Sequence, residues 1–149
     1  MRNWSSIIHS AQYFIAVAKR FMTRPKPDRS ELDGLRILIV EDDWWIGTGL
    51  AALLEAWGAD VIGPAATSAD AVNLVSENSP DVALVDISLR LGERSDSLID
   101  QLHDQGIRVV VISGYPEVLI TNGKPVAFLQ KPIREEQLLA SLRPALQTE

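Results

Sequence analysis

The feature that most constrains the fold is a regular alternation of short apolar runs with helical patterns after residue 35. Five runs rich in β-branched and other apolar residues follow one another: RILIV (36–40), ADVIG (59–63), DVALVD (81–86), IRVVVIS (107–113) and VAFLQ (126–130). Such runs are typical of buried strands. Parallel strands need crossover connections, which are usually helices. The alternation therefore predicts an α/β fold, with a parallel sheet covered by helices on both faces.

The helical patterns lie between these runs. They are expected over about 45–57, 68–78 and 95–106, and from about 134 onward. Ser68 is the expected N-cap of the second helix, and Ser95 is expected to start the third. The connection between residues 113 and 126 is short, so any helix there should be stunted or irregular. Trp44 and Trp45, at the entrance of the first helix, are expected to pack against the rest of the domain; the alternative is that one of them partly covers the acids after the first strand.

Several strand ends place ionisable or hydroxyl side chains at one edge of the expected sheet, where ligands of open α/β sheets bind. They are Glu41, Asp42 and Asp43 after the first strand, Asp86 at the end of the third, Ser113 at the end of the fourth and Lys131 after the fifth. At an effective dielectric constant of about 20, two like charges about 5 Å apart repel by about 3 kcal/mol. The acids therefore predict a hard cation such as Mg²⁺, which prefers oxygen ligands.

Four short motifs occur in order on this alternation: LIVEDD, DVALVD, ISGY and LQKP. With them, residues 35–147 resemble the receiver domain of two-component response regulators. The segments GPAATSADAV, DISLRLGERS and SGYPE further resemble stand-alone alphaproteobacterial receivers that carry a Phe-Ala-Thr-Gly-Tyr motif. The chain keeps the hydroxyl, glycine and tyrosine of that motif as Ser113, Gly114 and Tyr115, but it has Val111 and Ile112 where Phe and Ala are expected.

The resemblance implies a flavodoxin-like doubly wound sheet of five strands in the order 2-1-3-4-5. It also implies that Asp86 accepts a phosphoryl group with the help of Mg²⁺. Asp42, Asp86 and the backbone carbonyl of Ser88 would bind the metal directly, and Glu41 would act through water. Asp43 matches no metal ligand of the family.

The remaining roles implied by the resemblance concern the phosphoryl group and the response to it. Ser113 would bond one phosphoryl oxygen and Lys131 would neutralise another, next to a cis Lys131-Pro132 bond. Ser113, Tyr115 and Phe128 would form the conformational switch, although Phe128 could equally be a core residue.

The expected function is that of a single-domain response regulator rather than an enzyme. It would accept the phosphoryl group from a histidine kinase or a histidine phosphotransfer protein and signal to a downstream protein through contacts. A phosphorylation-independent interaction module with the same fold is the alternative. A phosphatase with an aspartyl-phosphate intermediate normally has a second aspartate two residues after the first, where this chain has Ser88.

The chain is expected to consist of a helical extension (1–23), a linker (24–34) that has prolines, a glycine and little apolar content, and a receiver domain (35–149). Residues 1–29 contain six basic residues and one acid, whereas the remainder contains 8 basic and 19 acidic residues. The whole chain has a net charge of −6. An acidic body argues against nucleic acid as a ligand. The chain lacks cysteine and has no apolar run long enough to cross a bilayer, so we expect a cytoplasmic protein.

An amphipathic stripe marks the N-terminal segment. Its apolar residues recur at intervals of three and four: Trp4, Ile7, Ile8, Ala11, Phe14, Ile15, Ala18, Phe21 and Met22. The stripe could form a homodimer with a second copy, pack on the receiver domain or lie on an anionic membrane. A disordered segment is a further alternative. A protein contact is favoured over the membrane, because Lys19 and Arg20 interrupt the apolar sequence at only one end.

Overall fold

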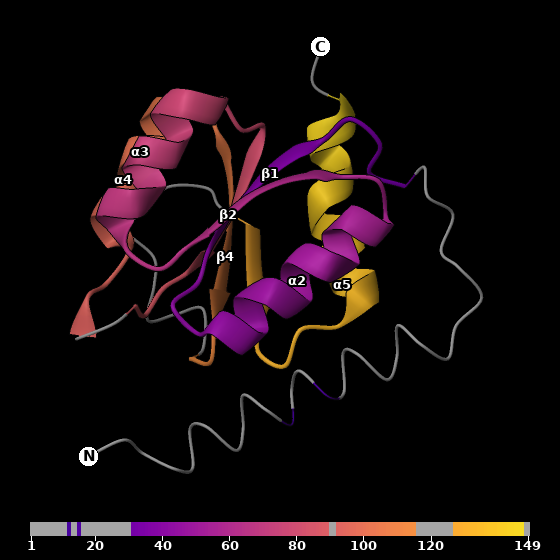
Figure 1. Cartoon of the computed structure of the whole chain (residues 1–149), viewed down its shortest axis with the longest axis horizontal. Coiled ribbons are helices and arrows are strands. Elements are labelled where there is room, and N and C mark those ends of the chain that lie inside the picture. Colours follow the sequence, from indigo (N-terminus) through magenta and orange to yellow (C-terminus); the bar gives the residue numbers. More distant parts are fainter. Residues whose placement is uncertain (1–11, 13–14, 16–30, 90–91, 116–126, 148–149) are drawn as a thin grey trace.

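The computed structural model describes residues 12, 15, 31–89, 92–115 and 127–147. Within these ranges the chain forms one five-stranded parallel sheet with the strand order β2-β1-β3-β4-β5 (Figure 1). The strands are β1 (Arg36–Val40), β2 (Asp60–Ala65), β3 (Val82–Asp86), β4 (Arg108–Ser113) and β5 (Ala127–Gln130). The predicted flavodoxin-like α/β fold with the order 2-1-3-4-5 is therefore confirmed.

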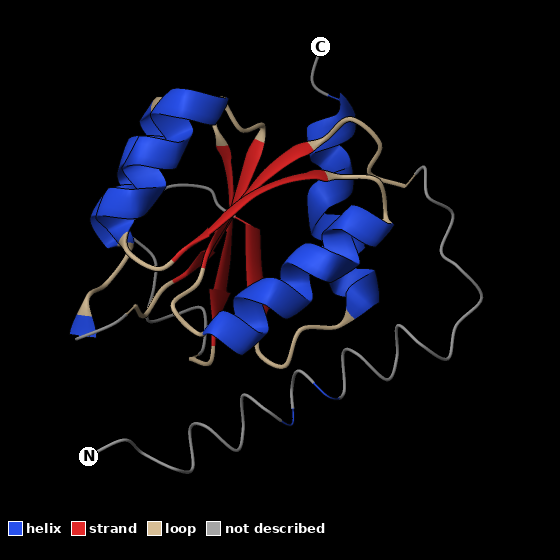
Figure 2. Cartoon of the chain, viewed as in Figure 1, coloured by secondary structure: helices blue, strands red, loops and turns tan. Residues whose placement is uncertain are grey.

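Helices cover both faces of the sheet, as Figure 2 shows. The helices are α2 (Trp44–Ala56), α3 (Ser68–Asn78), α4 (Asp96–Asp104) and α5 (Glu135–Leu142), the last continued by the 3-10 helix η3 (Arg143–Gln147). Apolar residues of α2 and α5 belong to one buried cluster, and those of α3 and α4 belong to another. The sheet thus separates two cores.

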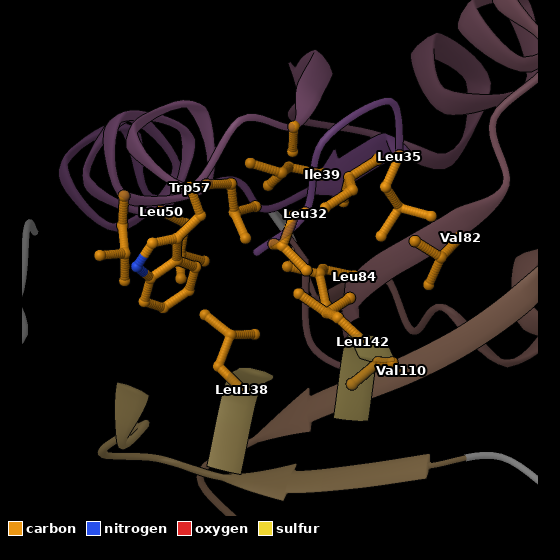
Figure 3. Packing of buried hydrophobic residues seen from close by; sticks show 14 of the residues in the cluster. Leu32, Leu35, Ile39, Leu50, Trp57, Val82, Leu84, Val110, Leu138 and Leu142 are labelled. Carbon is orange, nitrogen blue, oxygen red and sulfur yellow. The ribbon is translucent and has the colours of Figure 1, made fainter. Parts of the chain in front are cut away.

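Each central strand contributes to both cores because successive side chains of a strand point to opposite faces. In β1, Ile37 and Ile39 belong to the cluster beneath α2 and α5, whereas Leu38 and Val40 belong to the other cluster. Figure 3 shows the first cluster, in which Trp57 packs among leucine and isoleucine side chains. Burial on both faces explains why the strands read as continuous apolar runs.

Hydrogen bonds at the helix starts differ in part from the sequence expectation. Thr67, rather than Ser68, is the N-cap of α3, and its hydroxyl accepts the N–H of Asp70 at 3.1 Å. The prediction of Ser68 was wrong by one residue, because either hydroxyl suits an N-cap and the sequence does not fix the residue at which the backbone turns. Ser95 does precede α4, but its side chain makes no cap bond to that helix.

Strand β2 continues through Gly63 and Pro64 to Ala65, beyond the expected end at residue 63. Gly63 has φ +95°, and a Cβ atom there would lie 2.9 Å from the carbonyl oxygen of Ile39, so glycine is required. The register against β1 shifts at this point, which is a β-bulge. As a result, the carbonyl of Ala65 accepts the N–H of Glu41 at 2.9 Å and fixes the backbone of an expected site residue.

The described part of the chain leading into β1 is packed against the end of α2. Leu32 is fully buried, although it lies in the expected linker, and its N–H donates to the carbonyl of Trp57 at 2.8 Å. The expected helical extension lies outside the described residues, apart from Gln12 and Ile15, which are helical and exposed. The connection over 116–126 also lies outside them. Among the described residues, no helix is long and apolar enough to span a membrane.

Candidate functional site

Three carboxylates meet at the carboxyl edge of the sheet. Glu41 and Asp42 directly follow β1, and Asp86 is the last residue of the neighbouring strand β3. One ligand oxygen from each lies within 4.8 Å of the others. Glu41 is 4% exposed and Asp86 6%, whereas Asp42 is half-buried. The parallel pairing of β1 with β3 therefore brings together the acids that the sequence predicted at this edge.

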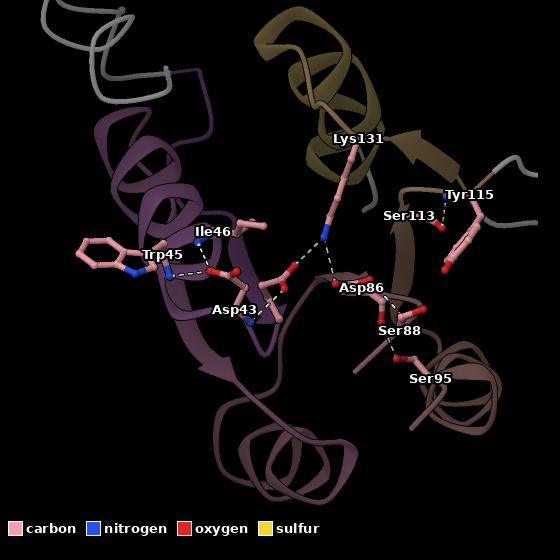
Figure 4. A network of polar contacts seen from close by, with 10 residues as sticks. Asp43, Trp45, Ile46, Asp86, Ser88, Ser95, Ser113, Tyr115 and Lys131 are labelled. Carbon is pink, nitrogen blue, oxygen red and sulfur yellow. Dashed lines mark hydrogen bonds and ion pairs between the residues drawn. The ribbon is translucent and has the colours of Figure 1, made fainter. Parts of the chain in front are cut away.

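A lysine that follows the edge strand β5 contacts two of these acids. The Nζ atom of Lys131, which follows β5, lies 3.0 Å from Oδ2 of Asp86 and 3.3 Å from Oε2 of Glu41 (Figure 4). Its backbone N–H donates to the carbonyl of Ser113 at 2.8 Å, and the Lys131-Pro132 peptide bond is cis. One ammonium group thus bridges two buried carboxylates.

The electrostatics of the site favour added positive charge. The pKa of Glu41 is raised to about 8, chiefly by burial; the charge of Lys131 lowers this pKa and the charge of Asp86 raises it. Burial and then the charge of Asp86 raise the pKa of Asp42. Burial lowers the pKa of Lys131, but attraction to Glu41 and Asp86 outweighs burial, and the net pKa is raised. A single ammonium group does not offset three acids.

Two serines hold Asp86, one by its carboxylate and the other by its backbone carbonyl. The N–H of Ser88 donates to Oδ1 of Asp86 at 3.0 Å, and the buried hydroxyl of Ser95 donates to the carbonyl oxygen of Asp86. The expected metal bond of the Ser88 carbonyl stays a prediction. The role of Ser95 was missed, because a serine before a helix reads as a cap and nothing in the sequence indicates a partner nine residues earlier.

Asp43 supports the site without joining the acid cluster. Its Oδ1 accepts the backbone N–H groups of Trp45 and Ile46 at 3.0 and 3.2 Å, so it is the N-cap of α2. Its own N–H donates to Oε1 of Glu41 at 3.1 Å. The three adjacent carboxylates of the sequence therefore have two purposes, because the third starts the helix that follows.

The three expected switch residues lie at the β4 and β5 side of the site. Ser113 ends β4, is fully buried, and its hydroxyl oxygen accepts the N–H of Tyr115 at 2.9 Å. Tyr115 is 57% exposed, whereas Phe128 in β5 is half-buried and packs against the core that contains α3 and α4. Ser113 and Tyr115 are drawn in Figure 4 beside Asp86 and Lys131. The switch itself stays a prediction.

The donor set of the acid cluster fits a hard divalent cation. Glu41, Asp42 and Asp86 offer carboxylate oxygens, which Mg²⁺ and Ca²⁺ prefer, and the half-buried Asp42 leaves one side of the cluster open to solvent. Mg²⁺ commonly keeps several waters and takes only one or two carboxylates directly. The residues present therefore suit a hard divalent cation such as Mg²⁺ or Ca²⁺.

This sheet order, acid cluster and bridging lysine define the class of protein. The family model of the response regulator receiver domain matches residues 37–143, and the chain belongs to this family.

The matched relatives include regulators of one type. The chain is 39% identical over 114 residues to the phyllosphere-induced regulator PhyR of Methylorubrum extorquens, covering 74% of this chain and 43% of that protein. Among solved structures, PhyR of Brucella abortus matches with a TM-score of 0.67 and 30% identity over 79% of this chain and 50% of that one. The PhyR receiver domain of Erythrobacter litoralis matches with a TM-score of 0.68 and 30% identity, and the match covers 76% of this chain and 91% of that one. The chain thus spans less than half the length of the Methylorubrum relative.

Proposed function

We propose that this chain accepts a phosphoryl group on Asp86 from a histidine kinase or a histidine phosphotransfer protein, and then signals through protein contacts. The observation that supports this most directly is the position of Asp86. It is nearly buried, 3.0 Å from the ammonium group of Lys131, and within 4.8 Å of two further carboxylates. On this proposal the protein is a signalling component of a two-component system rather than an enzyme.

In the proposed reaction, a carboxylate oxygen of Asp86 attacks the phosphorus atom of a phosphohistidine. The new O–P bond forms as the P–N bond breaks, and the imidazole nitrogen leaves with the electron pair of that bond. Catalysis of such a transfer is largely positioning and charge neutralisation. Ser88 N–H and Lys131 Nζ hold the two oxygens of the acceptor, and Lys131 stays close enough to neutralise a phosphoryl oxygen.

Asp42, Asp86 and the backbone carbonyl of Ser88 would bind Mg²⁺ directly. Glu41 would act through a water molecule. When bound, it would neutralise charge on the phosphoryl oxygens. The observation that favours this ion is the cluster itself, because burial and mutual repulsion raise the pKa values of Glu41 and Asp42. A divalent cation relieves this repulsion more completely than Lys131.

Signalling would begin at Ser113. Its hydroxyl oxygen accepts the N–H of Tyr115, so the hydroxyl hydrogen can be donated to a phosphoryl oxygen. A movement of Ser113 toward that oxygen would displace Tyr115, which is already exposed, and Phe128, which is only half-buried. The surface around β4 and β5 would then differ between the two states, and a downstream protein could recognise one of them.

Phosphotransfer profiling tests this function. Autophosphorylated histidine kinases and phosphotransfer proteins from the source organism are mixed with the full chain, with Asp86→Asn and with Asp81→Asn. We expect rapid transfer from one donor or a few donors to the wild type and to Asp81→Asn, and no transfer to Asp86→Asn. Transfer from no donor would contradict the proposal and favour the phosphorylation-independent interaction module.

A further inference from the structure

The outward side of helix α2 is unusually apolar for a surface helix. Trp44 is 64% exposed and Trp45 45% exposed, and their rings form an edge-to-face pair with centroids 4.9 Å apart. The expectation that both would pack against the domain was wrong: Asp43 starts the helix so that Ile46 turns inward, and both tryptophans stay at the surface. In Figure 4, Trp45 points away from the acid cluster.

The rest of the outward side of α2 is also largely apolar. We define the α2 outer face as the residues of α2 that are exposed or half-buried: Trp44, Trp45, Thr48, Ala51, Ala52, Glu55 and Ala56. The hydroxyl of Thr48 donates to the carbonyl of Trp44 at 2.7 Å, which uses its donor within the helix. Glu55 is the only charged residue of α2. A helix that is apolar on both sides is normally covered on both.

We propose that the apolar stripe of the N-terminal segment of the same chain, residues 4–22, packs on the α2 outer face. The attachment point supports an intramolecular contact. The N–H of Leu32 donates to the carbonyl of Trp57, so the continuous described chain that starts at residue 31 is attached at the C-terminal end of α2. Tethering at this point makes the docking intramolecular and raises the effective concentration of the segment to about the millimolar range.

The N-terminal segment is long enough to cover the whole of α2. Helix α2 has 13 residues and is about 20 Å long, and a helix over residues 4–22 would be about 28 Å long, at about 1.5 Å per residue. A helix that leads directly into the attachment point would run parallel to α2. Residues near 22 would then lie beside Ala56 and residues near 11 beside the tryptophan pair, and the earliest residues would extend past the start of α2. Ala11 and Ala18 in the stripe, like Ala52 on α2, allow close approach of two helices.

The charges match in this parallel arrangement. Lys19, Arg20 and Arg24 would lie near the C-terminal end of α2, where helix carbonyls carry partial negative charge. Glu55 is exposed there, and α2 has no basic residue in its last turn. The segment with a surplus of positive charge therefore meets an acidic end, and its apolar stripe meets the apolar outer face.

A disulfide-trapping experiment on the full chain tests this docking, and it is independent of phosphorylation. The chain has no cysteine, so a pair introduced as Ala18→Cys and Ala52→Cys has no competing thiol. A disulfide requires Cα atoms about 4.4–6.8 Å apart. With oxidised glutathione at low protein concentration, we expect an intramolecular disulfide to form about tenfold faster than in a control pair. Ala18→Cys with Ala69→Cys is the matched control, because Ala69 is an exposed alanine in α3 on the opposite side of the sheet.

Two described residues provide the second control. Ile15 belongs to the stripe and Gln12 does not, and both are helical and exposed, so neither change removes core packing. Ile15→Glu should slow the Ala18–Ala52 cross-link about tenfold, whereas Gln12→Glu, with the same added charge, should leave its rate within about twofold.

Three outcomes would overturn the proposal. Equal rates for the Ala52 and Ala69 pairs would mean that the segment does not select α2. Disulfides formed mainly between chains would assign the face to a second copy. Intramolecular trapping that Ile15→Glu does not slow would show that the stripe is not the contacting surface.

Discussion

Replacing Glu41 by glutamine should stabilise the metal-free protein at neutral pH. The change replaces a nearly buried carboxyl group, whose ionisation is disfavoured in the folded protein, by a neutral amide of nearly the same shape. The amide oxygen can still accept the N–H of Asp43, but the amide nitrogen then takes the position of Oε2 and cannot accept from Lys131, which keeps Asp86 as its partner at 3.0 Å. The variant therefore removes repulsion among the acids without opening a cavity.

The magnitude follows from the pKa of Glu41, which burial raises from 4.5 to about 8. The folded protein binds a proton more tightly than the unfolded chain, so the stability from this group is present below pH 4.5 and is lost as pH rises through about 8. With about 1.4 kcal/mol for each pKa unit, the raised pKa of Glu41 destabilises the folded protein by at most about 3 kcal/mol at pH 7. Glu41→Gln should recover about 1–3 kcal/mol of this, because Lys131 shares the titration.

Urea denaturation followed by circular dichroism measures the effect, with a chelator present, at about pH 5, 7 and 8. The wild type should lose stability steadily across this range, whereas Glu41→Gln should show a flatter profile. Asp43→Asn is the matched control: it removes a neighbouring charge but can still cap α2, and it should keep the slope of the wild type. If the stability of Glu41→Gln fell with pH as steeply as that of the wild type, the pH dependence could not be assigned to the raised pKa of Glu41.

Three further predictions concern the metal, the packing of α2 and the backbone of Asp86. Asp42→Asn should reduce the rise in melting temperature caused by Mg²⁺. At a Mg²⁺ concentration well above both Kd values, a tenfold weaker affinity lowers the stabilisation of the folded protein by Mg²⁺ by about 1.4 kcal/mol. Gly47→Ala should cost about 1–3 kcal/mol in urea denaturation despite the better helix propensity of alanine, because its Cβ would lie 2.9 Å from Cγ of Pro64. Ser95→Ala should cost about 1–3 kcal/mol, because it leaves the buried carbonyl of Asp86 without that donor.

Each of these changes has a matched control. Asp43→Asn should keep the full response to Mg²⁺, and an equal loss in both variants would place the metal elsewhere. Gly114→Ala should be nearly neutral, because no heavy atom lies within 4 Å of its Cβ position. Ser97→Ala, at an exposed position of α4, should change stability by less than about 0.5 kcal/mol. Costs equal to those of the controls would contradict the packing and bonding described for Gly47 and Ser95.

The fold was predictable from the sequence because its signals are local and repeated. The central strands are buried on both faces, so each reads as an apolar run, and every crossover between β1 and β4 contains a helix whose apolar residues recur at helical spacing. The convergence of Glu41, Asp42, Asp86 and Lys131 at one edge follows from the parallel direction of the strands. No detailed coordinates are needed for that inference.

The details that sequence reasoning missed depend on tertiary contacts. Strand β2 continues through Gly63 because the close approach of Ile39 requires a residue without a side chain, and a Gly-Pro pair ordinarily signals a turn. The hydroxyl of Ser95 bonds to Asp86 only because the loop after β3 folds back, where Ser88 and Arg94 form an isolated bridge. No periodicity or motif spacing in the sequence indicates either contact.

The most direct test of the central claim is to locate the phosphoryl group after reaction with a small phosphodonor such as acetyl phosphate and Mg²⁺. Intact-mass measurement and peptide mapping of the full chain should show one added phosphoryl group, on the peptide that contains Asp86. The label should be absent from Asp86→Asn and strongly reduced by a chelator. A label on another residue, or an undiminished label in Asp86→Asn, would contradict the assignment of Asp86 as the phosphoacceptor.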